Sequence, residues 1–265
     1  MNRLDPVFLD EALAVAREAA SAAADVIAHY YRRDVAVELK ADQSPVTRAD
    51  VESEQAIRAV LQRAYPDHAI YGEEAGRSGD GDFLWLVDPI DGTKSFVRRY
   101  PFFSTQIALM HRGELVLGVS CASAFGETMW ARQGGGAYFN GERVSVADTT
   151  ELAQAALSTG NLKSLARGAG WRTLAELVQA ANRTRGYGDF YHYHLLARGS
   201  LDVVIESDVN ILDIAALAVI VREAGGVFSD LDGAELALDT TSVLAATRAL
   251  HPALLARFQG WRAHG

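Results

Sequence analysis

Five carboxylate side chains lie in short motifs whose neighbours suit a metal site. The apolar run 83–87 is typical of a buried strand, and Asp88 follows it directly. Asp91 comes three residues later, Gly92 then permits a tight turn, and Thr93 opens what we expect to be a short helix. Carboxylates bind hard cations, and free N–H groups at a helix start donate to phosphate oxygens. The segment therefore predicts a site for a metal ion and a phosphate group.

Two further acidic segments lie away from this motif. Glu73 and Glu74 are adjacent, and neighbouring carboxylates repel each other unless cations or solvent separate them. Asp213 stands at the start of the apolar stretch 212–224, which we expect to be a helix. Each segment has an ordinary alternative: a solvated loop for the glutamates, and backbone-capping turns for the two aspartates above. Only their joint occurrence with the motifs below favours the metal site.

Hydrophobic spacing predicts an α/β fold whose N-terminal half is α+β. Residues 5–32 and 50–64 have the spacing of helices, and a run of short strands then predicts an antiparallel meander. Strands alternate with helices in the second half, which indicates α/β organisation. The polar stretch 147–150 divides a metal- and phosphate-binding half, 1–147, from a half, 148–265, that adds the last metal ligand and the specificity residues. The expected strands are 83–87, 106–110, 115–120, 128–131 and 201–205, and the further helices are 174–181, 190–198 and 212–224.

Composition excludes several classes of protein. The 265 residues are 49% hydrophobic and 22% charged, which is ordinary for a globular chain and argues against disorder. A net charge of −9 and the lack of a basic run argue against a nucleic-acid scaffold. The single cysteine, Cys121, excludes an internal disulfide and suits a reducing cytoplasm. We expect no signal peptide in residues 1–7 and no membrane helix.

Two conspicuous patterns have structural explanations. Gly134-Gly135-Gly136 resembles a nucleotide-binding loop, but Asn140-Gly141 shortly afterwards is a strong hairpin signal and no helix clearly follows. We therefore expect a hairpin. His192 and His194 have no cysteine partner and no metal-ligand spacing, so we expect ordinary surface or core histidines.

Five motifs, in the right order, resemble the signatures of the inositol monophosphatase superfamily of Mg²⁺-dependent, lithium-sensitive phosphatases. The likeness covers nearly the whole chain and implies a layered αβαβα architecture of the sugar-phosphatase type and a homodimer. One departure is Leu212, where the family usually has Trp; we expect this change to alter packing more than chemistry. The matching motifs are Val46-Thr47-Arg48-Ala49-Asp50, Gly72-Glu73-Glu74, Asp88-Pro89-Ile90-Asp91-Gly92-Thr93, Leu212-Asp213-Ile214-Ala215-Ala216 and Glu223-Ala224-Gly225-Gly226.

The resemblance implies a role for each matched residue. Two or three Mg²⁺ ions would be bound: one by Glu73, Asp88 and the Ile90 carbonyl, and another by Asp88, Asp91 and Asp213. Thr93 and Glu73 would orient the attacking water. The resemblance implies that Glu74 and Asp50 make outer contacts or bind a third ion, and that Asp50 is also a catalytic residue. The backbone N–H groups of Gly92 and Thr93 would bind the phosphate.

Three local features are similar to the histidinol-phosphate phosphatase branch. They are the segment Arg185-Gly186-Tyr187-Gly188-Asp189-Phe190, the segment Asp91-Gly92-Thr93-Lys94-Ser95-Phe96 and, more weakly, residues 97–107. Histidinol phosphate carries an ammonium and an imidazole, so a carboxylate such as Asp189 would favour it over a neutral polyol by about 1.5–3 kcal/mol. Asp189 could equally cap the helix 190–198. Glu206, seven residues before Asp213, is a second candidate for substrate contact.

Three other functions stay open at this point. An inositol-1-phosphatase or a broad monoester phosphatase is the closest alternative to a histidinol-phosphate phosphatase of histidine synthesis. A 3′,5′-bisphosphate nucleotidase shares the Thr93-Lys94 pair. A non-catalytic metal-binding module would retain the fold without turnover. In each case the expected partner is a small phosphate ester or a metal ion, not a nucleic acid or a membrane.

Overall fold

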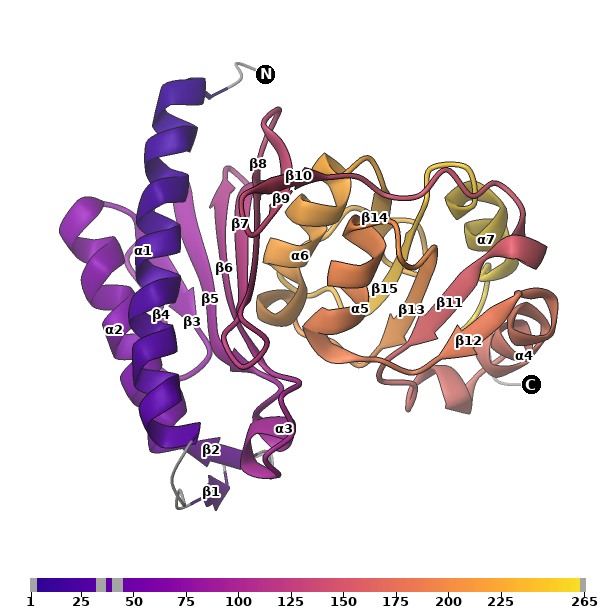
Figure 1. Ribbon diagram of the computed structural model, residues 1–265, viewed down its shortest axis with the longest axis horizontal. Coiled ribbons are helices and arrows are strands. Elements are labelled where there is room, and N and C mark those ends of the chain that lie inside the picture. The colour runs from indigo at the N-terminus through magenta and orange to yellow at the C-terminus, as the bar shows by residue number, and fades with distance from the viewer. Residues whose placement is uncertain (1–3, 32–36, 40–44, 263–265) are drawn as a thin grey trace.

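The computed structural model describes residues 4–31, 37–39 and 45–262. Two β-sheets alternate with three layers of helices (Figure 1). The outer layer on one side holds α1 (Pro6–Tyr31) and α2 (Arg48–Ala64), and the layer between the sheets holds α5 (Asp189–Ala197) and α6 (Ile211–Glu223). The far outer layer holds α4 (Gly170–Ala180) and α7 (His251–Arg257). This is the predicted αβαβα arrangement.

The larger sheet has eight strands in the order β10-β9-β8-β7-β6-β5-β3-β4. Neighbouring strands are antiparallel except β3 and β5, which run parallel. The strands from β5 to β8 form the expected meander. Their bounds are β3 (Ala69–Gly72), β4 (Gly76–Ser78), β5 (Phe83–Asp91), β6 (Ser104–His111), β7 (Glu114–Ala122), β8 (Glu127–Arg132), β9 (Gly136–Phe139) and β10 (Glu142–Val144).

The smaller sheet has five strands in the order β12-β11-β13-β15-β14. Strand β11 runs parallel to β12 and β13, whereas β15 runs antiparallel to β13 and β14, so the sheet is mixed. Its strands are β11 (Ala156–Thr159), β12 (Arg183–Arg185), β13 (Val203–Ser207), β14 (Val227–Ser229) and β15 (Ser242–Ala246). The remaining elements are the pair β1 (Val37–Leu39) and β2 (Pro45–Thr47), the short helix α3 (Thr93–Val97), and the 3-10 turns η1 (Leu152–Gln154) and η2 (Leu165–Arg167).

Three apolar cores hold the layers together. One lies between α1, α2 and the larger sheet, with Ile57, Trp85 and Ile107 fully buried. The central core surrounds α6, whose residues face a sheet on both sides, which explains why its sequence is apolar all round. The third core lies under α4 and α7. Leu212, where the family usually has Trp, is 2% exposed in the central core, consistent with a change in packing.

Most predicted elements agree with the structure. The helices expected over 5–32, 50–64 and 212–224 are α1, α2 and α6. The expected hairpin is also present: Asn140-Gly141 joins the antiparallel strands β9 and β10, and the glycine-rich segment forms the turn before β9. The predicted division after residue 147 falls between β10 and η1. It remains a prediction, since α6 from the second half packs on the first sheet. No helix of the described residues is long and apolar enough to cross a membrane.

Candidate active site

An irregularity at the end of β5 brings two aspartates to the same place. Asp88 pairs with Gln106 of β6 and Asp91 pairs with Ser104, so three steps on β5 oppose two on β6. In a regular strand residues three apart point to opposite faces, and the extra residue of a bulge removes that separation. Asp88 Oδ1 accepts a hydrogen bond from the Ile90 N–H at 2.9 Å, which fixes this bend.

The strand prediction for this segment was too short. The apolar run ends at residue 87, whereas β5 continues through Pro89, which has no N–H to donate, as far as Asp91. Strand β3 ends at Gly72, opposite Val87, so the ladder on that side has finished before Pro89 is reached. The proline carbonyl is still used, because it accepts a hydrogen bond from the Thr105 hydroxyl at 2.9 Å.

A tight turn then places Thr93 beside the two aspartates. Gly92 has φ +89°, and a Cβ there would meet the Phe102 carbonyl oxygen at 2.5 Å, so the turn requires glycine. Thr93 Oγ1 lies 3.1 Å from the Ile90 carbonyl oxygen and 3.2 Å from Asp50 Oδ1. The Thr93 hydroxyl therefore links β5 to the start of α2.

The start of α2 explains why Asp50 is fixed although it is fully buried. Asp50 Oδ2 accepts hydrogen bonds from the Thr47 N–H at 2.8 Å and the Thr47 hydroxyl at 2.7 Å, while Thr47 caps the helix. This capping box satisfies the first N–H groups of α2. The remaining oxygen, Oδ1, faces Thr93.

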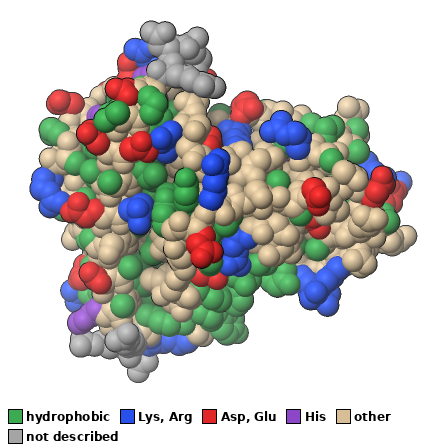
Figure 2. Space-filling model, turned by 45° about the horizontal axis from the view of Figure 1, so that its top comes forward, with side chains coloured by type: hydrophobic (Ala, Val, Ile, Leu, Met, Phe, Trp, Pro, Cys, Tyr) green, Lys and Arg blue, Asp and Glu red, His purple; other side chains and the backbone are tan. Residues whose placement is uncertain are grey.

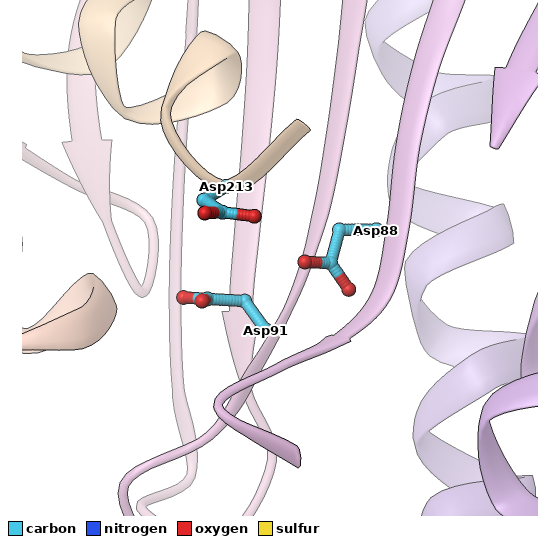
Figure 3. A group of neighbouring side chains, drawn as sticks. All are labelled: Asp88, Asp91 and Asp213. Carbon is cyan, nitrogen blue, oxygen red and sulfur yellow. The ribbon is translucent and has the colours of Figure 1, made fainter. Parts of the chain in front are cut away.

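The third aspartate comes from the other half of the chain. Asn210 and Asp213 form a second capping box at the start of α6, with the Asn210 N–H 2.9 Å from Asp213 Oδ2. Asp213 then points toward Asp88 and Asp91 (Figure 3). One carboxylate oxygen of each lies within 4.8 Å of the others, close enough to share a cation.

These residues line one cavity of about 180 Å³. Its wall is mostly polar, and it includes the Ile90 backbone predicted to supply a carbonyl ligand. The lining residues are Glu73, Asp88, Ile90, Asp91, Gly92, Thr93, Lys94, Ser95, Asn161, Asp189 and Asp213. Two larger hollows, of about 510 and 590 Å³, lie at the end of α6 and beside α1, well away from this carboxylate group.

The aspartates are held in an electrostatic environment that disfavours their charges. Burial, with repulsion from Glu73 and the other aspartates, raises the pKa of Asp88 well above its usual range. Burial and the charges of Asp189 and Asp213 do the same to the pKa of Asp91. Burial chiefly raises the pKa of Asp213 to about 7. Bound cations would remove this penalty, so the all-oxygen donor set fits hard metal ions.

Asp189 lines the same cavity from a different element, α5, and contributes its own part of the wall. The N-cap of α5 is Gly188, which makes no side-chain cap bond, and Asp189 is the first helical residue, so the alternative of an Asp189 cap does not hold. Its φ of +46° is uncommon for a residue with a side chain, and such strain often marks a functional position. Burial and the charge of Glu206 raise the Asp189 pKa to about 6.

Glu206 is near this wall but does not form part of the cavity lining. It is 3% exposed, and its Oε1 accepts the Asn161 N–H at 3.0 Å. Its Oε2 accepts the Tyr193 hydroxyl at 2.8 Å and lies 3.2 Å from His192 Nε2. Glu206 thus holds the Asn161 loop behind the cavity, and its predicted contact with substrate remains a prediction.

Several residues of the site were missed from sequence. Asn161 lines the cavity although it belongs to none of the motifs, and Lys94 and Ser95, quoted above only as markers of a branch, line it as well. Glu54 binds the backbone of the Glu73-Glu74 loop, with the Glu74 N–H 2.7 Å from its Oε2. Its spacing of four residues from Asp50, on one face of a predicted helix, is the signal that could have found it.

Comparison with known proteins identifies the family. The model of the inositol monophosphatase family matches residues 9–261. The chain belongs to the inositol monophosphatase family. A histidinol-phosphatase of Streptomyces coelicolor is 37% identical over 239 residues, 87% of this chain and 88% of that protein. A histidinol-phosphatase of Mycobacterium tuberculosis is 40% identical over 208 residues, 76% of this chain and 79% of that protein.

Solved structures agree with this assignment. The inositol monophosphatase of Anabaena superposes with a TM-score of 0.83 at 28% identity, covering 95% of this chain and 96% of that one. The family and its histidinol-phosphatase members together identify this chain as a phosphatase. The acidic cluster agrees with the metal dependence that is general in the family.

Proposed function

We propose that this phosphatase hydrolyses L-histidinol phosphate with two or three Mg²⁺ ions. The observation that carries the substrate assignment is Asp189, a carboxylate in the cavity wall on a strained backbone, apart from the group formed by Asp88, Asp91 and Asp213. The histidinol-phosphatase names of the two relatives above support the same substrate.

Residues of this chain would divide the metal ligands as the family resemblance implies. Glu73, Asp88 and the Ile90 carbonyl would hold one ion, and Asp88, Asp91 and Asp213 another, with Glu74 in support. When bound, Mg²⁺ supplies positive charge that offsets the carboxylates and stabilises the phosphoryl oxygens during displacement. The N–H groups of Gly92 and Thr93 would position the phosphate.

Thr93 and Asp50 would handle the proton of the attacking water. Thr93 Oγ1 accepts the water proton while it donates its own to Asp50 Oδ1, 3.2 Å away. Burial raises the Asp50 pKa, which makes this carboxylate a better proton acceptor. Glu73, which lines the same cavity, would orient the same water.

Asp189 would recognise the leaving alcohol by its positive charge. An ammonium or imidazolium group beside Asp189 forms a charge-assisted hydrogen bond worth about 1.5–3 kcal/mol. A neutral polyol would offer Asp189 no charge-assisted hydrogen bond. Glu206 would act beside it as a second substrate residue, directly or through Asn161.

A panel of phosphate esters under one Mg²⁺ condition tests the proposal. We expect kcat/KM for histidinol phosphate to exceed that for inositol-1-phosphate by about tenfold or more, the equivalent of one charge-assisted hydrogen bond. Equal or slower hydrolysis of histidinol phosphate would reject the substrate and favour an inositol-1-phosphatase or a broad monoester phosphatase. Preference for a 3′,5′-bisphosphate would favour the nucleotidase.

The non-catalytic alternative has its own test. A metal-binding module would bind Mg²⁺ and release no phosphate from any ester of the panel. The presence of Thr93 and Asp50 in hydrogen-bonding contact favours an active enzyme, because a pure binding module has no use for a proton acceptor.

We also propose that the protein is a homodimer, by family resemblance, and that it is cytoplasmic, because its single cysteine, the buried Cys121, suits a reducing compartment. The face shown in Figure 2 interleaves acidic and basic side chains among its described residues, which agrees with a small-molecule rather than a nucleic-acid partner. Light scattering of the purified protein would give twice the 28.6 kDa chain mass for a dimer.

A further inference from the structure

The β3–β4 hairpin folds around the buried carboxylate of Glu54, which takes no part in the proposed reaction. Glu54 lies on α2, one helical turn after Asp50, and its side chain is 1% exposed. The hairpin pairs Gly72 with Gly76, so its loop is the three residues 73–75. Glu73, which lines the active-site cavity, is the first residue of that loop.

Glu54 holds this loop by its backbone. Its Oε2 accepts the Glu74 N–H at 2.7 Å, and its Oε1 accepts the Ala75 N–H at 3.1 Å. Successive N–H groups turned toward one anion form a nest, a concavity of the backbone that binds anions. The Glu73 N–H bonds to the Val87 carbonyl at 3.2 Å, so all three N–H groups of the loop are fixed.

Arg58 completes the clamp on its other side. Its Nε lies 2.7 Å from Glu54 Oε1, which compensates the buried charge. Its other nitrogens donate to the Gly76 carbonyl at 2.5 Å and to the Ser78 hydroxyl at 3.0 Å, both on β4. The arginine is only 11% exposed, so this is a shielded, multiply bonded pair, unlike the ion pairs of the surface.

Gly72 shows how closely the loop and the carboxylate fit. A Cβ at this position would meet both oxygens of Glu54 well inside van der Waals contact. The backbone before Glu73 can therefore approach α2 only because residue 72 has no side chain. The Gly-Glu-Glu motif thus depends on a glutamate almost twenty residues earlier.

We propose that Glu54, with Arg58, is a positioning residue that aims Glu73 into the cavity and thereby sets the affinity for the divalent cation. This inference rests on the proposed function. Asp50 and Glu54 occupy one face of α2 at a spacing of four residues, so one helix orients both the proton acceptor of Thr93 and the Glu73 loop. A shift of α2 would disturb both together.

Mn²⁺ binding to the full-length protein without substrate, counted by electron paramagnetic resonance, tests the inference. Glu54→Gln keeps the size but loses the charge and turns an amide group toward one N–H of the nest. We expect its Mn²⁺ affinity to fall about tenfold, as for other residues that orient a metal ligand. At saturating Mg²⁺ its kcat should stay near that of the wild type, because Glu54 does not touch substrate.

Glu52→Gln is the matched control. Glu52 forms an i,i+4 pair with Arg48 at 2.7 Å on the same helix, but both side chains are exposed, at 38% and 77%. We expect unchanged Mn²⁺ affinity and an unchanged melting temperature. If Glu54→Gln had a lower melting temperature but the Mn²⁺ affinity of the wild type, the role of Glu54 would be purely structural and the proposal would be overturned.

Arg58→Met covers the case in which Glu54→Gln does not fold. It leaves the nest anion in place but removes its compensating charge and both bonds to β4, so Mn²⁺ affinity should fall several-fold; unchanged affinity overturns the proposal. A wild type that binds no Mn²⁺ also overturns it. If the wild type binds Mn²⁺ but hydrolyses no ester, and Glu54→Gln still binds Mn²⁺ more weakly, only the proposed function is rejected.

Discussion

The two walls of the active-site cavity are built in different ways. The metal wall takes Asp88, Asp91 and Thr93 from one short turn, in which Asp88 and Thr93 are held by hydrogen bonds to Ile90. It takes Glu73 and Asp213 from other elements. The wall around Asp189 is assembled from α5 and from the segment after β11, where Asn161 lies. Glu206 of β13, outside the lining, binds the Asn161 N–H across 45 residues of sequence. The β5 turn at the centre of the metal wall is local in sequence, whereas no part of the recognition wall is.

This difference suggests which wall can vary. A local turn carries its own geometry, so its residues must be kept as a group. A wall assembled from separate elements can change one side chain while the others stay in place. We infer that the metal wall determines the reaction and the Asp189 wall determines the substrate. The predictions below separate the two.

The largest effect is expected on the metal wall. Asp88→Asn should lower kcat by about 10²–10³-fold or more, the usual loss when a key electrostatic group of an active site is removed. The substitution also removes a buried charge whose pKa is raised by burial and by Glu73, so the metal-free protein should melt at the same temperature or higher. Steady-state kinetics and calorimetry check both. Wild-type turnover at saturating Mg²⁺ would contradict the metal assignment.

A smaller, substrate-dependent effect is expected on the other wall. Asp189→Asn should reduce kcat/KM for histidinol phosphate about tenfold, because a charge-assisted hydrogen bond becomes a neutral one. Hydrolysis of a neutral ester such as inositol-1-phosphate should change little, and this ester serves as the internal control. Equal losses for both esters would place Asp189 in the reaction rather than in recognition.

The metal wall should also give the metal-free protein an unusual pH dependence. The folded-state pKa of Asp213 is about 7, whereas the ordinary value is 3.8. Between these two pH values the folded protein therefore binds more protons than the unfolded chain. Stability should therefore rise, by roughly 1 kcal/mol, as the pH falls from about 8 to about 6.5. Saturating Mg²⁺ should abolish this slope in thermal melts, and a slope that persists with Mg²⁺ would contradict the shared site.

Below that window histidines act in the opposite direction. Burial lowers the pKa of His68, His194 and His251. His68 Nδ1 also lies 3.2 Å from the Trp85 indole nitrogen, from which it accepts a hydrogen bond in its neutral form. The unfolded chain binds more protons at these sites below about pH 6.5, so their contribution to stability is lost on further acidification. The metal-free protein should thus be most stable in mildly acidic solution.

The same contrast explains what could be read from the sequence. The helices and the meander follow from periodicity, and the family match supports that fold. Contiguous motifs also pointed to Asp88, Asp91 and Asp213, which the structure brings together. The apolar run did not reveal that β5 extends past Pro89, because the end of β3, which leaves the missing proline N–H without consequence, depends on pairing between distant residues. Glu54 and Asn161 were missed for a related reason: their importance lies in long-range backbone contacts, which leave no motif.

The smallest effect is expected at Asn161, and it separates the shape of the recognition wall from its charge. The Asn161 N–H is held by Glu206 and its carbonyl accepts the Ser207 N–H at 2.7 Å, so Asn161→Ala should leave the backbone in place. Loss of one neutral hydrogen bond to substrate costs about 1 kcal/mol, which predicts a rise in KM of about fivefold and no change in kcat. A rise shared by charged and neutral esters would show that Asn161 contributes general affinity. A rise confined to histidinol phosphate would instead make Asn161 part of the charge-selective contact, and a fall in kcat would mean that the recognition wall also shapes the reaction.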